Sequence, residues 1–311
     1  EACQIFQDRL VLKIPPKAFA GYDTAGVLRF VQEARENWHI TAEERAIAKA
    51  LGEIQSDANI LSVVVMPFAN QSRIAYRIYE KGEPIHSETV IKGKLRVAED
   101  LQDILDTVTC RWKKFDAVGI AVPGVPKHGR LELDCTMIDP ELDLQKLLED
   151  KYQVPIVITN NVNSAVMGFY VQQDKYQNIL FLSHPRGYTI PGEAIVIHGH
   201  LVQGAHNIAG EIKYLLYAAM PHNAWREHCA DMEIINYYIS MSIRAGISIV
   251  DPEVVVVRSE MIPDMEKLKQ RLIDDYVREE YLPEFIHVCD KEMSEYAMLG
   301  QMILTLEALE K

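Results

Sequence analysis

The chain has 311 residues, 48% of them hydrophobic and 25% charged, which is ordinary for a globular protein and long enough for two lobes. Its formal net charge is −13, so general nucleic-acid binding is not expected, because an acidic chain repels the phosphate backbone. No stretch approaches the roughly 20 apolar residues that span a bilayer, and no secretion signal is visible, so we expect a cytoplasmic protein.

Residues 1–58 are predicted to form an N-terminal appendage. It contains a short strand candidate that ends at Pro15, followed by helical patterns over 24–37 and 41–54. The second helix begins with Thr41 in a capping-box pattern, and its apolar residues recur on one face. Its charges are mixed, so it lacks the basic and polar character of a helix that reads DNA.

Two similar series of elements follow the appendage. The first series predicts strands over 60–66, 73–79 and 86–91, a helix over 97–113, a strand over 115–124, a helix over 142–152, a strand over 154–161 and a helix from about 163 to 172. The second predicts strands over 178–184 and 193–200, a short strand near 201–202, a helix over about 226–248, a strand over 251–257, a helix over 264–279, a strand over 284–289 and a helix over 294–310. The same order of strands and helices therefore occurs twice along the chain.

This duplication predicts an α/β protein with two lobes that face each other across a cleft, where ligands are expected. We place the first lobe at residues 59–165 plus 293–311 and the second at 166–292. Strands that alternate with helices favour a mainly parallel sheet in each lobe.

Five segments resemble the ROK family (repressor, open reading frame, kinase) over roughly residues 59–311. They are VGIAVPGV at 118–125, VPIVITNNVNSAVMG at 154–168, HGHLVQGAHNIAGEI at 198–212, ISIVDPEVVVV at 247–257 and MLGQMILTLEAL at 298–309. The family includes glucokinases, N-acetylmannosamine kinases and xylose-type repressors. The resemblance implies the actin-like ATPase fold, which is ribonuclease H-like, built from duplicated βββαβαβα units.

The resemblance also implies a catalytic base, and this chain departs from the family there. The family segment E-N-D-A-N carries an Asp that takes the proton of the attacking sugar hydroxyl, whereas Asn161 occupies that position here. An amide cannot accept a proton at physiological pH, and loss of such a base costs roughly 10²–10⁴ in rate. The family Glu at the start of the segment is Thr159. We therefore expect no catalytic residue.

Both loops that would hold nucleotide phosphate in the family also differ. The family's D-I-G-G-T-K is replaced by residues 67–72, which contain no glycine and no acid, and Pro67 has no amide hydrogen to donate. The family's L-G-T-G-I-G-G-G is replaced by the longer segment 183–193, which has two prolines. The expectation is that the chain binds no nucleotide cofactor.

A structural zinc site is implied by the family but is not expected here. Tyr214 stands where the family has a His that also touches the sugar. His222, His228 and Cys229 lie nearby at the wrong spacing and without the paired cysteines of such a site.

The positions that face sugar in the family are retained at Gly124, Asn160, Asn161 and Glu211. These residues are our candidate sugar-binding set, since buried polar groups need partners and a sugar would supply them. An alternative stays open: the two asparagines could merely cap the helix that follows, and Glu211 could be a solvated loop acid.

Three functions are consistent with these observations. The first is a catalytically inactive ROK protein, a pseudokinase that senses sugar or regulates transcription in carbohydrate metabolism. The second is an ATP-dependent, glucokinase-like sugar kinase with altered phosphate loops. The third is a structural or assembly protein without a small-molecule ligand. The resemblance further implies a homo-oligomer, a dimer or a tetramer. A DNA-binding domain is lost, reduced to the two helices of the appendage, or placed before Glu1.

Overall fold

The computed structural model describes residues 58–68, 71–93, 95–112, 115–132, 141–185, 190–219, 231–262, 264–275 and 277–309. The strand and both helices predicted for the appendage lie outside these residues. Within the described part, no helix has the length and apolar character needed to cross a membrane.

The first sheet has five strands in the order β3-β2-β1-β4-β7. Its strands are β1 (Asn59–Phe68), β2 (Gln71–Glu80), β3 (Glu83–Lys92), β4 (Ala117–Val122) and β7 (Ile156–Asn160). The first three strands form an antiparallel meander, and β4 and β7 run parallel to β1. All six residues of β4 are buried, as expected of a strand covered on both faces.

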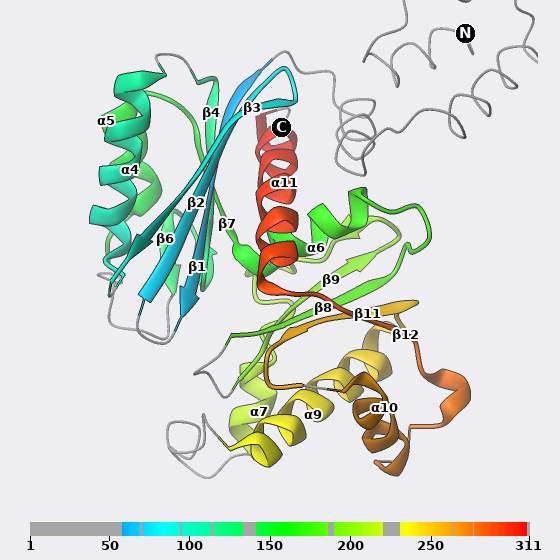
Figure 1. Cartoon of the computed structure of the whole chain (residues 1–311). Helices are drawn as coiled ribbons and strands as arrows, with labels where there is room; N and C mark the ends of the chain where they lie inside the picture. The colour runs from blue at the N-terminus through cyan, green and yellow to red at the C-terminus, as the bar shows by residue number, and fades with distance from the viewer. Residues whose placement is uncertain are drawn as a thin grey trace, which may run out of the picture.

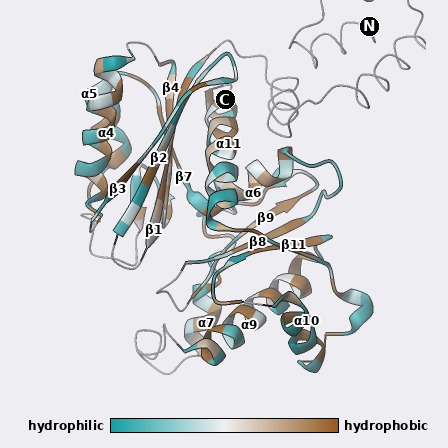
Figure 2. Ribbon diagram, viewed as in Figure 1, coloured by the Kyte–Doolittle hydropathy of each residue, from teal (hydrophilic) through white to brown (hydrophobic). Residues whose placement is uncertain are grey.

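Helices cover both faces of this sheet (Figure 1). α4 (Val97–Arg111) and α5 (Leu144–Tyr152) lie on one face, and α11 (Asp290–Leu309) lies along the other. In α4 the buried positions recur every three or four residues, which places one stripe of the helix against the sheet. Figure 2 shows the corresponding alternation of hydrophobic and hydrophilic colours around α4, α9 and α10.

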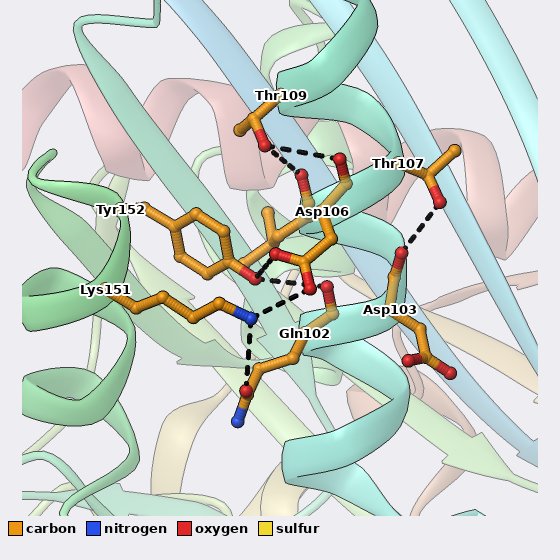
Figure 3. Close-up of polar contacts among 8 residues, drawn as sticks. Gln102, Asp103, Asp106, Thr107, Thr109, Lys151 and Tyr152 are labelled. Atoms are coloured by element: carbon orange, nitrogen blue, oxygen red, sulfur yellow. Dashed lines mark hydrogen bonds and ion pairs between the residues drawn. The ribbon is translucent and has the colours of Figure 1, made fainter.

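A polar cluster joins the exposed sides of α4 and α5 (Figure 3). Asp106 of α4 accepts hydrogen bonds from Lys151 Nζ and Tyr152 Oη, each at 2.8 Å. Tyr152 also donates to the carbonyl of Gln102, at 3.0 Å. Burial, followed by the bond to Asp106, raises the pKa of Tyr152 to about 12. The cluster fixes the two helices to each other.

The second sheet repeats the strand order of the first, as β10-β9-β8-β11-β12. Its strands are β8 (Ile179–His184), β9 (Gly192–Ile197), β10 (His200–Leu201), β11 (Val254–Ser259) and β12 (Glu284–His287). The helices of this lobe are α7 (Lys213–Ala219), α9 (Met232–Val250) and α10 (Met265–Asp274), with a 3₁₀ turn, η2 (Glu279–Tyr281). The repeated order confirms the predicted duplicated, two-lobed α/β fold.

Two crossing helices lie between the sheets, α11 and α6 (Asn161–Val171) (Figure 1). They approach so closely that a Cβ added at Gly168 would lie 1.9 Å from the carbonyl oxygen of Tyr296. A Cβ at Gly300 would likewise lie 1.8 Å from the carbonyl oxygen of Ser164. Apolar side chains from both sheets and both helices form one buried cluster here, so the lobes share a core.

The predicted elements after residue 58 are present, with ends that differ by a few residues. The hairpin of β5 (Val125–Lys127) and β6 (Arg130–Glu132), the helix α7 and the turn η2 were not predicted. All four elements are short, so each holds too few residues to show a repeating pattern of apolar side chains in the sequence. The predicted lobe boundaries remain a prediction.

Candidate functional site

Gly124 and Asn160 meet at the carboxyl ends of β4 and β7. Gly124 has a φ of 97°, a conformation that favours glycine, and its carbonyl accepts a hydrogen bond from Asn160 Nδ2 at 2.8 Å. The Asn160 Oδ1 accepts from the backbone N–H groups of Val162 and Asn163, at 2.8 and 3.2 Å. Asn160 therefore caps α6, as the alternative interpretation held, and also ties that cap to the Pro-Gly loop.

Asn161 is the first residue of α6 and is buried, with 6% of its surface exposed. Its Nδ2 donates to the carbonyl of Val65 at 3.0 Å, near the end of β1. The amide thus lies beside the strand that leads into the first loop. The amide can donate a hydrogen bond through its nitrogen and accept one through its oxygen, but it does not accept a proton at neutral pH. Asn161 can therefore orient a hydroxyl group but cannot deprotonate it.

Thr159 points away from these two residues, into α11. Its hydroxyl bonds with Ser164 Oγ at 2.7 Å and with Gln301 Oε1, and Gln301 Nε2 donates to the carbonyl of Val157. These side chains are buried and satisfy one another. The position that is a Glu in the family therefore belongs here to the packing between β7 and α11.

Glu211 lies just before α7, in the loop that follows β10. Its carboxylate is 3.5 Å from the ammonium of Lys213, which is 7% exposed. The ammonium also lies 5.3 Å from the centre of the Tyr214 ring. Glu211 is therefore half-buried and ion-paired, not the freely solvated acid of the alternative interpretation.

Asn207 connects the two lobes at this loop. Its Nδ2 donates to the carbonyl of Pro126 at 3.0 Å, which joins the 204–211 loop of the second lobe to the Pro-Gly loop of the first. Asn207 has a φ of 58°, a conformation that asparagine tolerates better than most residues. The bond brings the loop that carries Glu211 to the loop that carries Gly124.

Glu193 is a buried carboxyl group at the start of β9, next to this loop. Its backbone N–H donates to the carbonyl of Gly210, while its side chain is 6% exposed and its Oε1 has no hydrogen-bond partner among the described residues. Burial raises the pKa of Glu193 well above its ordinary value, because the charged form of the carboxyl group is poorly solvated there.

The two regions that replace the phosphate loops are paired or filled in the described part of the chain. β1 and β2 pair as far as Phe68 and Gln71, so strand pairing occupies most of the first region. In the second, the His184 ring is fully buried and its Nδ1 bonds with Ser259 Oγ at 3.1 Å. Residues 69–70 and 186–189 of these regions lie outside the described residues, so the expectation that the chain binds no nucleotide stays a prediction.

Among the described residues, no three His, Cys, Asp or Glu side chains lie together as metal ligands would. His222, His228 and Cys229 are outside the described residues. The expectation about zinc therefore stays a prediction.

The geometry brings three of the four candidate residues together and connects the loop of the fourth to them. Gly124 and Asn160 are bonded directly, Asn161 follows Asn160 in the chain, and Glu211 reaches them through the Asn207 bridge. Their contact with sugar stays a prediction, since the partners observed here are protein groups.

Comparison with known proteins places this geometry in a family. The model of the ROK family matches residues 73–231, about half of the chain. The xylose repressor of Bacillus subtilis is 28% identical over 101 residues, which are 32% of this chain and 26% of the repressor. The chain thus matches about a quarter of the length of that relative.

Solved structures show the same fold over longer stretches. A ROK family glucokinase from Streptomyces griseus, solved with glucose and AMPPNP, superposes with a TM-score of 0.58 at 15% identity, over 80% of this chain and 99% of the glucokinase. A ROK family transcriptional regulator, a homologue of the E. coli MLC protein, superposes with a TM-score of 0.56 at 13% identity, over 99% of this chain and 97% of the regulator.

Sequence reasoning missed three residues that shape the site: Glu193, Asn207 and Lys213. Glu193 and Lys213 lie outside the five segments that resemble the family, and Asn207 lies within one of them. A charged residue beside a ligand loop was the available signal at Glu193 and Lys213, but their burial and partners depend on the tertiary structure.

Proposed function

This chain belongs to the ROK family, and from that premise we propose that it is a cytoplasmic, sugar-responsive regulatory protein that does not transfer phosphate. The observation that carries the proposal is Asn161 at the position of the family base, with its Nδ2 bound to the Val65 carbonyl. An amide cannot accept a proton at neutral pH, so it cannot act as the general base that activates a hydroxyl for attack. The remaining polar groups would then serve binding alone.

The candidate sugar set supports the binding half of the proposal. Asn161 can bond with a hydroxyl through its amide, and the Glu211 carboxylate can accept from one while Lys213 holds it in place. The glucokinase with bound glucose shares this fold. The proposal assigns sugar contact to Gly124, Asn160, Asn161 and Glu211.

The regulatory half rests on the relatives. The chain resembles xylose repressors in sequence and a transcriptional regulator in fold. Sugar binding would alter the fit between the lobes at the Asn207–Pro126 bridge, because both loops of the site meet there. We propose that this change is passed to a second subunit of a dimer or tetramer.

The test is a thermal-shift screen of the full chain against pentoses, hexoses, amino sugars and ATP with Mg²⁺, paired with a coupled phosphorylation assay. We expect stabilisation by at least one sugar, none by ATP, and no turnover. Glu211→Gln should weaken the sugar effect about tenfold or more, since a hydrogen bond to a charged acceptor is lost. Lys151→Gln, far from the cleft, is the matched control and should leave sugar affinity unchanged.

The outcomes separate the three functions. Sugar-dependent turnover of ATP would establish the kinase alternative and contradict the proposal. A chain that responds to no sugar at any concentration tested would instead favour a structural role. Asn161→Asp should restore no activity, because the phosphate loops differ as well.

A further inference from the structure

Gln301 is a fully buried amide in α11, the helix that lies against the first sheet and α6 (Figure 1). Its Oε1 accepts hydrogen bonds from the Ser164 hydroxyl, at 2.9 Å, and from the Thr159 hydroxyl. Its Nε2 donates to the carbonyl of Val157 and to Thr305 Oγ1, each at 3.2 Å. A single side chain therefore joins α11 to both β7 and α6.

The elements that Gln301 joins are those that carry the candidate sugar set. β7 ends at Asn160, and α6 begins at Asn161. The Ser164 hydroxyl lies 3.2 Å from the carbonyl oxygen of Asn160, and the Asn160 side chain in turn donates to the carbonyl of Gly124. A short chain of contacts thus leads from the Gln301 amide to the residues that are proposed to hold sugar.

β4, the strand that leads into the loop of Gly124, leaves space for the same amide. Gly119 in β4 pairs with Val157 of β7. A Cβ added at Gly119 would lie 2.7 Å from Gln301 Nε2 and 2.0 Å from Thr305 Oγ1. Glycine in a strand often marks such a close approach of another part of the chain. Both strands whose ends carry the sugar set therefore lie directly against the polar side chains of α11.

The network is polar at a place where apolar packing would also fill the space. Ser164 and Gln301 are fully buried, and Thr159 is 7% exposed. Buried groups lose their hydrogen bonds to water, so replacing a whole bonded set by apolar groups of the same shape is often neutral or stabilising. Hydrogen bonds have direction, however, whereas apolar contacts do not. The network therefore suits a requirement for position better than a requirement for stability.

We propose that Gln301 is a positioning residue of the sugar site. Its hydrogen bonds fix the corner between β7 and α6, so that Asn160 and Asn161 present one geometry to a sugar. The inference rests on the proposed function, because it concerns the same sugar set. Gln301 itself acts through the corner and not by contact, since its amide is fully buried and bonded to protein groups.

The test compares the triple variant Thr159→Val/Ser164→Ala/Gln301→Leu with the wild type, both as full chains. The three polar partners are replaced together, so none of these side chains is left unpaired, and urea unfolding should give a stability close to that of the wild type. Titration calorimetry with D-xylose, D-glucose and D-glucosamine measures sugar affinity. For any of these sugars that binds the wild type, the affinity should fall about three- to tenfold, the loss expected when one neutral hydrogen bond to the ligand is misaligned. A role in stability alone would leave that affinity unchanged.

Ser62→Ala is the matched control. The Ser62 hydroxyl is buried and donates to the carbonyl of Met298 in α11 at 3.0 Å, so it also joins α11 to the first sheet, but it holds β1 and not the corner between β7 and α6. This variant should lose stability and keep its sugar affinity. Ser164→Ala alone leaves Thr159 as a donor to Gln301 and gives a folded variant to measure if the triple variant does not fold. Its sugar affinity should also fall.

The outcomes distinguish this inference from the proposed function. Wild-type sugar affinity in both the triple variant and Ser164→Ala, or an equal loss in Ser62→Ala, would overturn the positioning role and leave sugar binding itself intact. If no sugar binds the wild type, the proposed function and this inference both fall.

Discussion

Glu193 has a buried carboxyl group whose Oε1 has no hydrogen-bond partner in the part of the chain that the structure describes, and its neighbour Gly192 begins β9. Burial alone raises its pKa, so the folded protein holds a proton that the unfolded chain releases. The stability contributed by that proton is complete below the unfolded pKa of about 4.3 and is lost as the pH rises through the higher folded value. The buried carboxyl group of Glu193 therefore lowers the free energy of unfolding as the pH rises toward neutral.

Glu193→Gln tests this at the residue scale. Glutamine has no proton to lose, so the stability of Glu193→Gln relative to the wild type should improve as the pH rises above about 4.3, the unfolded pKa of glutamate. Urea unfolding at several pH values measures the difference. Glu284→Gln, an exposed acid, is the control and should show no such trend in this range. Parallel pH profiles for Glu193→Gln and the wild type would contradict the argument.

Asn160 shows a second feature of single residues in this fold. It has a local role as the cap of α6 and a second role toward the loop that carries Gly124. Position alone predicts the first role, because Asn and Asp commonly occupy helix starts. The partner of the second role is set by tertiary packing.

At the scale of elements, α6 and α11 cross with backbone against backbone. Gly168 and Gly300 leave no room for a Cβ, because the nearest atoms are main-chain carbonyl groups that cannot rotate away. Gly246 in α9 is different: its added Cβ would meet the tip of the Leu180 side chain at 2.3 Å, and that side chain can move. An added Cβ would therefore clash with main-chain atoms at Gly168 and Gly300, but only with a side chain at Gly246.

Gly168→Ala and Gly300→Ala should each cost about 2–3 kcal/mol or more of unfolding free energy through overpacking at the crossing. Gly246→Ala should cost about 1 kcal/mol or less, since leucine can repack and alanine favours helix. Denaturant unfolding of the three variants measures this. An equal effect at all three positions would mean that the helices can separate, contrary to a fixed crossing.

At the scale of the whole molecule, the lobes are joined by the shared core and by the Asn207–Pro126 bridge. The core stabilises the contact between the lobes through buried apolar surface, without directed bonds. The bridge is a directed hydrogen bond beside the candidate sugar set. It is the natural place for a ligand to alter how the lobes meet.

Asn207→Gly keeps the backbone conformation at φ 58° but removes the bridge, so we expect a loss of about 1 kcal/mol and faster amide exchange in the 124–127 and 204–211 loops. Asn207→Ala should lose about 1 kcal/mol more, because alanine is strained in this conformation. Hydrogen exchange and unfolding measure both effects. Unchanged exchange in Asn207→Gly would show that the bridge does not restrain the loops.

The sequence alone determined the duplicated fold and most of its elements. A strand such as β4 is apolar at every position, and a helix such as α4 repeats its apolar residues every three or four positions, so local pattern is enough to identify them. The same sequence placed Asn161 at the family's base position and Gly124 in the Pro-Gly turn. These are statements about residue type and order along the chain.

Only the tertiary structure decided which groups are partners. Asn207 and Pro126 are 81 residues apart, Thr159 and Gln301 are 142 apart, and Arg258 and Asp290 are 32 apart. Hydrogen bonds and ion pairs depend on distances of a few ångströms, which periodicity does not encode. The sequence therefore determines which chemical groups the cleft can contain, and packing decides which of them remain available to a ligand.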